Sequence, residues 1–268
     1  MYKTIIALSL IATCLIAENT QDIKDEIKDT KAKIAKLRAN LKELQSTLPK
    51  EDYVFKARAE VGYVANSGNT NSEAFNADTK ITNKWDLHSL EASMLMQYGT
   101  ENDKESKKRF LGELLYDYKL SKVLSINYLV GYKDDKFSGY DYQFYTGPGA
   151  KYVLIETDFH DLNLDGNFLY VQDKIYGEPI NSYLGYRIKG VYNMQMLENL
   201  KFHQTLSFRS EFSDIQNYFA YSKTAFTTRL SDIFSTGIAY HIDYTNQQPF
   251  SGKTSTDKMF TFNLIADY

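Results

Sequence analysis

The sequence predicts an all-β fold: an antiparallel transmembrane β-barrel of about 12 strands, preceded by an N-terminal helical coiled coil. Three observations support this. Apolar and polar residues alternate from residue 53 to the end of the sequence, apolar residues recur in heptads before that, and tyrosine and phenylalanine are abundant (22 and 16) while proline is scarce (4). Alternation and aromatic content are typical of amphipathic strands.

Residues 1–17 are predicted to be a signal peptide. Lys3 precedes an apolar run from Ile5 to Ile16, and Ala17 offers a small residue for cleavage. The run is too short for a membrane-spanning helix of about 20 residues. Lipid attachment at Cys14, the single cysteine, is the alternative. Cleavage after Ala17 leaves no thiol, and a formal net charge of −3 for the full chain argues against a nucleic-acid partner.

Residues 18–50 are predicted to form a periplasmic coiled-coil helix that ends at Pro49. One reading is an amphipathic helix lying against the next domain. The other, which the narrow apolar stripe favours, is a homo-oligomer formed through residues 22–48. In a parallel dimer Lys33 would meet Arg38, so the number of chains stays open. The seam residues are Ile23, Ile27, Thr30, Ile34, Leu37, Leu41, Leu44 and Leu48.

Residues 51–268 are predicted to form the barrel, an outer-membrane domain. Phe55 and Ala57 share one face of the first strand, whereas Lys56, Arg58 and Glu60 share the other. Three charges in succession on one face require water or charged partners on that side, so lipid is expected on the apolar side. The strands are expected to start near Tyr53, Glu73, Ser89, Arg109, Val123, Asp141, Phe159, Ser182, Leu200, Tyr218, Ile233 and Lys258.

The connections and the C-terminus give the predicted orientation. Connections after odd strands read as long polar loops, whereas those after even strands read as short turns, which is the asymmetry of outer-membrane barrels. An even count places both chain ends in the periplasm. The last strand is expected to close the sheet on the first and to look like the signal read by the outer-membrane insertion machinery. Its apolar face comprises Phe260, Phe262, Leu264, Ala266 and Tyr268.

Two short motifs carry a family resemblance. Ser67, Gly68, Asn69 and Thr70 follow the first strand, and the segment Thr146–Tyr152 reads TGPGAKY. Together with the strand pattern and the aromatic terminus, they make residues 53–268 resemble the domain of unknown function 481 family, described as salt-induced outer-membrane proteins. The resemblance implies an outer-membrane barrel and brings no catalytic residues. The heptad segment lies outside it.

The sequence predicts no enzyme, no cofactor and no metal site. His241 and Asp243 are expected to share the inward face, but no exposed serine or acidic cluster accompanies them. Their side chains are therefore interpreted as an interior polar pair.

Besides the lumen-lining residues named below, the inward face is expected to carry Lys80, Lys133, Lys151, Lys223, Arg229, Asp78, Glu91, Asp117, Asp165 and Asp267. Cations outnumber anions in this inward set, which allows two functions. The favoured one is a narrow channel for small solutes or ions with a mild anion preference. The alternative is a closed structural or envelope-organising barrel that oligomerises or tethers through the coiled coil. The predicted lumen-lining residues are Lys56, Arg58, Glu60, Arg109, Glu113, Lys119, Arg187, Lys189, Lys201, His203, Arg209, Glu211, His241 and Asp243.

Overall fold

The computed structural model describes residues 24, 26–40, 53–67, 71–250 and 255–268. The chain divides into two units, Met1–Glu51 and Asp52–Tyr268. The predicted signal peptide lies outside the described residues, as do the seam residues Ile23, Leu41, Leu44 and Leu48. No helix in the described part of the chain is long and apolar enough to cross a membrane.

Residues 26–40 form a helix in which every side chain is exposed. Of its predicted seam residues, Ile27 is 49%, Ile34 is 43% and Leu37 is 67% exposed. The prediction of a helix is confirmed over these residues. Self-association of the helix stays a prediction.

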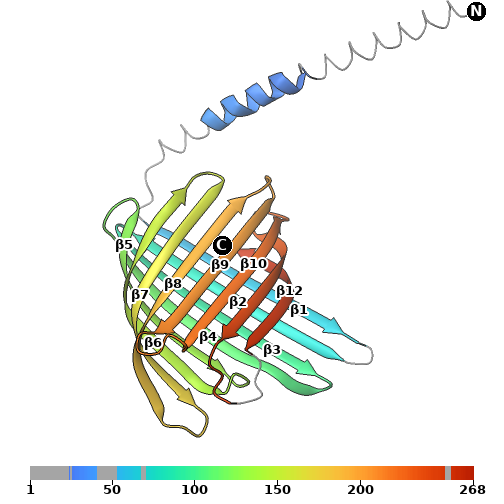
Figure 1. Cartoon of the computed structure of the whole chain (residues 1–268). Coiled ribbons are helices and arrows are strands. Elements are labelled where there is room, and N and C mark those ends of the chain that lie inside the picture. The colour runs from blue at the N-terminus through green and yellow to red at the C-terminus, as the bar shows by residue number, and fades with distance from the viewer. Residues whose placement is uncertain (1–23, 25, 41–52, 68–70, 251–254) are drawn as a thin grey trace, which may run out of the picture. The chain divides into compact units, whose positions relative to one another are not determined.

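The second unit is a closed antiparallel barrel of twelve strands, in which each strand pairs with its neighbours in sequence (Figure 1). The predicted strand count is confirmed. The strands are β1 (Tyr53–Asn66), β2 (Ser72–Trp85), β3 (His88–Glu101), β4 (Lys104–Lys119), β5 (Leu124–Asp135), β6 (Tyr140–Glu156), β7 (His160–Ile175), β8 (Ile180–Gln195), β9 (Leu200–Glu211), β10 (Tyr218–Arg229), β11 (Phe234–Thr245) and β12 (Thr256–Asp267).

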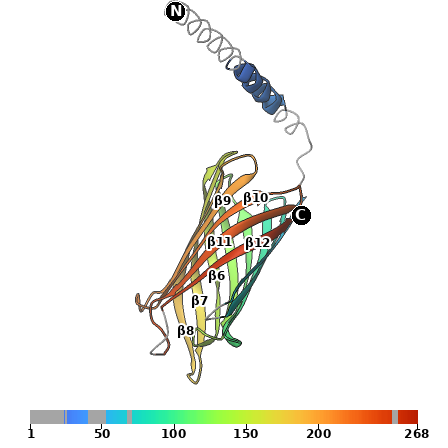
Figure 2. The same cartoon turned by 90° about the vertical axis from the view of Figure 1, so that its right-hand side faces the viewer.

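The last strand closes the barrel on the first. Val61 of β1 pairs with Leu264 of β12, and the backbones of Ala57 and Tyr268 exchange two hydrogen bonds of 2.8 Å. Figure 2 shows β12 along one wall of the barrel, with the C-terminus at one end. Pairing of β12 on both sides leaves the sheet without an open edge. The alternating C-terminal segment is therefore the strand that completes the sheet.

The connections differ from those expected. The segment from Thr100 to Lys108 was predicted to be a long loop, but β3 and β4 continue through it and meet at Asn102 and Asp103. Both of these residues have positive φ (49° and 63°), which a tight hairpin turn requires.

The two ends of the barrel are named by their connections. We call the end that holds the C-terminus and the β2–β3 connection the turn end, and the opposite end the loop end.

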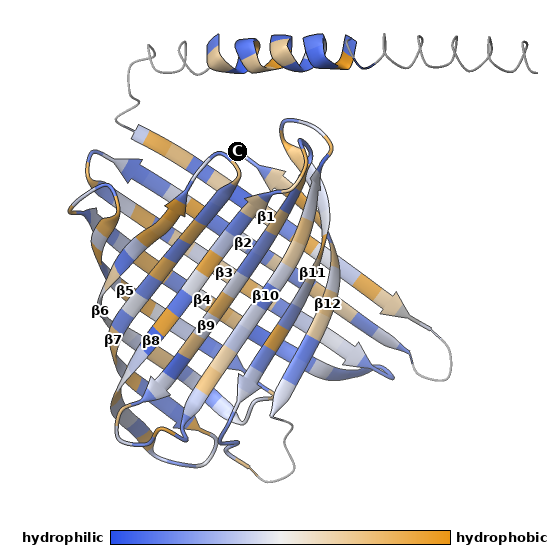
Figure 3. Ribbon diagram, turned by 45° about the horizontal axis from the view of Figure 1, so that its top comes forward, coloured by the Kyte–Doolittle hydropathy of each residue, from blue (hydrophilic) through white to orange (hydrophobic). Residues whose placement is uncertain are grey.

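Exposed apolar side chains lie on the outer face of the sheet and most buried polar side chains on the inner face. Hydropathy alternates along the strands in Figure 3. The outer face exposes large apolar side chains, and its aromatic residues include Tyr53 and Phe234 near the turn end and Tyr63 and Tyr98 near the loop end. Phe260, Phe262 and Leu264 are each more than half exposed on this face. Other exposed apolar residues are Val61, Ile81, Met94, Leu114, Phe168, Ile188, Leu206 and Ile238.

The interior also contains an apolar core that the sequence interpretation missed. Leu129 and Leu169 are 1% exposed, and Val171 is fully buried. Together with Leu115, Tyr145 and Tyr183, they form one cluster inside the wall from β4 to β8. Gly131 makes room for this cluster, because a Cβ at this position would lie 2.1 Å from the ring of Tyr145.

We predict that Gly131→Ala destabilises the barrel by about 1 to 3 kcal/mol, because the added methyl group overpacks against Tyr145. Gly166→Ala is the matched control, since its Cβ would meet nothing within 4 Å, and we expect it to be neutral or slightly stabilising. Urea unfolding of refolded protein measures both changes. Equal effects of the two substitutions would contradict the packing.

Candidate functional site

The strand register places the predicted lumen residues on the inward face. Lys56, Arg58 and Glu60 alternate with the exposed residues of β1, and the same parity holds along the paired strands. Of the predicted family loop, Ser67 is exposed, whereas Gly68, Asn69 and Thr70 lie outside the described residues. The segment Thr146–Tyr152 lies within β6.

A first charged bridge links β4 and β8, between which β5, β6 and β7 lie. Arg187 Nη1 donates to Glu113 Oε1 at 2.7 Å, and the hydroxyl of Tyr145 donates to the same oxygen at 2.7 Å. Lys189 Nζ lies 3.7 Å from the other carboxylate oxygen. The carboxylate of Glu113 therefore holds three strands together from inside the barrel.

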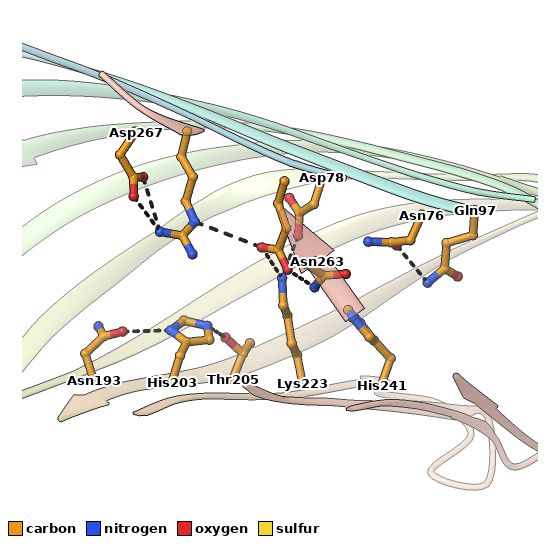
Figure 4. A network of polar contacts seen from close by, with 12 residues as sticks. Asn76, Asp78, Gln97, Asn193, His203, Thr205, Lys223, His241, Asn263 and Asp267 are labelled. Atoms are coloured by element: carbon orange, nitrogen blue, oxygen red, sulfur yellow. Dashed lines mark hydrogen bonds and ion pairs between the residues drawn. The ribbon is translucent and has the colours of Figure 1, made fainter. Parts of the chain in front are cut away.

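A second bridge links β4 to β11, where Arg109 donates to Asp243. A third links β10 to β1 and β2: Lys223 Nζ lies 3.3 Å from Glu60 Oε2 and 2.8 Å from Asp78 Oδ2. Figure 4 shows Lys223 extending from one wall toward Asp78 on the other. Both bridges join strands that do not pair in the sheet.

The bridging side chains are buried. Arg187 is 4%, Arg109 5%, Glu60 5% and Lys223 9% exposed. The carboxylates of Glu113 and Asp243 are 15% and 16% exposed, so these bridges have little contact with water, and burial demands that each charge keep its partner.

Arg209 forms no ion pair within 4 Å with any residue in the described part of the chain. Its guanidinium lies 4.7 Å from the ring centroid of Tyr145 and 4.5 Å from that of Phe219. Cation–π contacts of this kind stabilise a desolvated guanidinium. Arg209 thus connects the apolar cluster of β4–β8 to β10.

Among the described residues, the inward histidines contact hydroxyl and amide groups and no carboxylate. His241 Nδ1 lies 3.0 Å from the hydroxyl of Tyr221, while Asp243 is bonded to Arg109. His203 contacts Asn193 at 2.7 Å and Thr205 at 2.9 Å. No group of three His, Cys, Asp or Glu residues able to hold a metal ion occurs in the described part of the chain.

The family model described as "Protein of unknown function, DUF481" matches residues 59–268. The chain belongs to this family. A relative, "Uncharacterized protein YdiY" of Escherichia coli (strain K12), is 25% identical over 217 residues, which span 78% of this chain and 82% of the relative. The predicted family is thereby confirmed.

Solved structures of similar fold include two channel proteins. The NanC porin is 12% identical, with a TM-score of 0.47, over 80% of this chain and 98% of that chain. The COG4313 outer membrane channel from Pseudomonas putida F1 is 8% identical, with a TM-score of 0.47, over 82% of this chain and 98% of that chain.

Within the barrel of this DUF481 member, several inward charges escaped the sequence interpretation. Asp173 accepts hydrogen bonds from Gln143 and Tyr183, at 3.1 and 2.7 Å, and Asp135 lies 3.9 Å from Lys133, which had been placed inside correctly. Because the missed acids outnumber the missed cations, the positive excess inside is smaller than expected. The missed inward charges are Lys84, Lys107, Asp135, Asp161, Asp173 and Asp257. Extending the period-two alternation to the ends of the strands would have identified these residues.

We predict that Glu113→Ala lowers the free energy of unfolding by about 3 to 5 kcal/mol, since it leaves Arg187 buried without a carboxylate. The control is Glu91→Ala, which breaks a 2.8 Å pair with Lys80, whose side chain is 48% exposed. That loss should be below about 1 kcal/mol. Equal losses in urea unfolding would show that the Glu113 bridge is not desolvated.

Proposed function

We propose that the protein is an outer-membrane β-barrel whose lumen is closed in the resting state and which anchors a self-associating periplasmic helix. The observation that carries the proposal is the burial of charged bridges inside a barrel whose outer face is apolar. A polar interior and an apolar exterior are the reverse of a water-soluble barrel. Lipid around the sheet explains the exterior, and ion pairing explains the interior.

The membrane placement follows from the cost of exposing the outer face to water. Side chains such as Phe168 and Leu206 are more than half exposed on this face, and a continuous apolar surface of that kind is an aggregation hazard in water. We place the turn end in the periplasm, because short turns lie on that side of bacterial barrels. The closing strand β12 then presents Phe260, Phe262 and Leu264 to lipid and to the outer-membrane insertion machinery.

The three bridges support the proposed closed state. Ion passage needs a continuous water-filled path, and the largely buried pairs of Arg187, Arg109 and Lys223 would interrupt it. The barrel in this state serves as an anchor, and its interior gives the anchor rigidity. We assign it no catalytic role, since Asp243 is bonded to Arg109 instead of His241.

A second candidate, a narrow channel with a mild anion preference, is favoured by one observation. Five polar side-chain atoms in the lumen wall formed by β2, β3, β11 and β12 are buried without a hydrogen-bond partner among the described residues. Each such atom disfavours the closed state by about 1 to 3 kcal/mol. Hydration of an opened lumen would satisfy them: Asn76 Nδ2, Gln97 Oε1, His241 Nε2, Thr261 Oγ1 and Asn263 Oδ1.

The helix supplies the second part of the proposal. Ile27, Ile34 and Leu37 recur at heptad spacing and are exposed, and an apolar stripe of this width suits a coiled coil. Association of copies through residues 22–48 would link barrels on the periplasmic side. We therefore propose an envelope-organising role for the helix, with the barrel as its membrane anchor.

We predict that refolded full-length protein shows no steady conductance in planar bilayers, because the bridges close the lumen. The charge-neutral variant Arg109→Ala with Asp243→Ala removes both partners of one bridge and should yield discrete current steps. Lys80→Ala with Glu91→Ala, a more exposed pair, is the control and should stay silent. Wild-type steps as large as those of the bridge variant would favour the channel candidate.

We predict that Ile27→Asn, Ile34→Asn and Leu37→Asn together reduce the oligomer to monomers in detergent, measured by light scattering after size-exclusion chromatography. Lys28→Asn, Ala32→Asn and Lys36→Asn carry the same substitution outside the seam and should preserve the oligomer. If the wild type is monomeric, or if both variants dissociate alike, association through the seam is wrong.

A further inference from the structure

Ion pairing inside the barrel is asymmetric along its axis. In the middle, the inward cations Arg109, Arg187 and Lys223 each have a carboxylate partner within 3.3 Å. Near the turn end, five inward cations are exposed, and none has an ion pair with a described residue. We call these five the basic cluster: Lys56, Lys84, Lys119, Lys201 and Arg229.

Three inward acids at this level are engaged in ion pairs, whereas Asp161, at the start of β7, accepts a hydrogen bond from Asn163 and attracts Lys84 of the basic cluster. Asp267 lies 3.2 Å from Arg58, Glu91 lies 2.8 Å from Lys80, and Asp117 lies 2.7 Å from Lys151. Each of these carboxylates neutralises a cation outside the basic cluster. The excess positive charge of the barrel interior is therefore concentrated at the turn-end mouth.

Two members of the basic cluster are close enough to repel a third. Lys84 of β2 is within electrostatic range of Lys56 of β1 and of Lys119 of β4, and Glu91 offsets part of this repulsion. Such repulsion raises the free energy of the mouth when no anion is bound, and a bound anion would relieve it. Lys201 of β9 and Arg229 of β10 add positive charge from another part of the rim.

Within the described residues, three acids in the neighbouring turns form no ion pair with the cluster. Asp86, Asp158 and Asp232 lie in connections at the turn end and are exposed. None of them forms an ion pair within 4 Å with a member of the basic cluster in the described part of the chain. They lie on the rim in contact with water, where salt screens their electrostatic interactions beyond about 8 Å at physiological ionic strength.

We propose that the turn-end mouth binds a small multivalent anion that carries phosphate or carboxylate groups. A single exposed ion pair contributes little, so useful affinity requires several cations to act on one ligand. The closed middle of the barrel limits the depth of the site, which favours a small ligand over a chain threaded through the lumen. A low-dielectric wall around the mouth strengthens its field. The site goes beyond the proposed anchor role and does not require ion passage.

The test uses refolded full-length protein in a nonionic detergent and inorganic tripolyphosphate as the probe. Isothermal titration calorimetry at about 50 mM salt, where screening is weak, gives the dissociation constant. The test variant is Lys56→Gln with Lys84→Gln and Lys119→Gln. The control, Lys104→Gln with Lys108→Gln and Lys258→Gln, removes the same charge from exposed lysines near the loop end.

We expect the wild type and the control to bind tripolyphosphate with the same dissociation constant. The test variant should bind at least about tenfold more weakly, which corresponds to a loss of about 1.4 kcal/mol of binding free energy. Lys201→Gln with Arg229→Gln is a second test variant and serves if the first fails to fold. Absence of wild-type binding, or an equal loss in the control, would overturn the proposal. An equal loss would mean that net charge alone attracts the probe.

Discussion

Glu113 of β4 accepts hydrogen bonds from Arg187 of β8 and from Tyr145 of β6, so a single carboxylate holds opposite parts of the barrel together. The same requirement governs the other ion pairs of the interior, because a charged side chain that is removed from water needs a partner of opposite charge inside the barrel. The bridges of Arg109 and Lys223 meet the same demand on other strands. Lipid on the outside and paired charge on the inside are thus two consequences of one alternating pattern.

The sequence predicted the wall of the barrel well. Period-two alternation identifies a strand and its two faces, so the strand count and the outward position of Phe260 and Leu264 could be read from local sequence. The closure of β12 on β1 was predicted because the alternating C-terminal segment needed a partner to complete the sheet. Expected strand starts differ most at β4, where charged residues from Lys104 to Lys108 resemble a loop but continue the hairpin.

The contents of the lumen were less predictable, because the contacts join residues far apart in the sequence. Arg187 lies 74 residues from Glu113, and Arg109 lies 134 residues from Asp243, so no local pattern indicates either pairing. The apolar cluster around Leu129 and Leu169 was missed for a different reason. In the sequence, a leucine at an inward position among charged residues looks like an isolated break in the apolar–polar alternation. In the folded barrel, several such residues from different strands pack together as one cluster.

A closed barrel with buried charges is stable only while its side chains exclude water from the middle of the lumen. Cysteine accessibility measures this directly, since the predicted mature chain has no cysteine of its own. Ala239→Cys places a thiol at an inward position that is 1% exposed, and Lys56→Cys places one at the exposed turn end. In liposomes, a water-soluble maleimide should label Lys56→Cys and leave Ala239→Cys protected. Equal labelling rates would contradict the closed lumen.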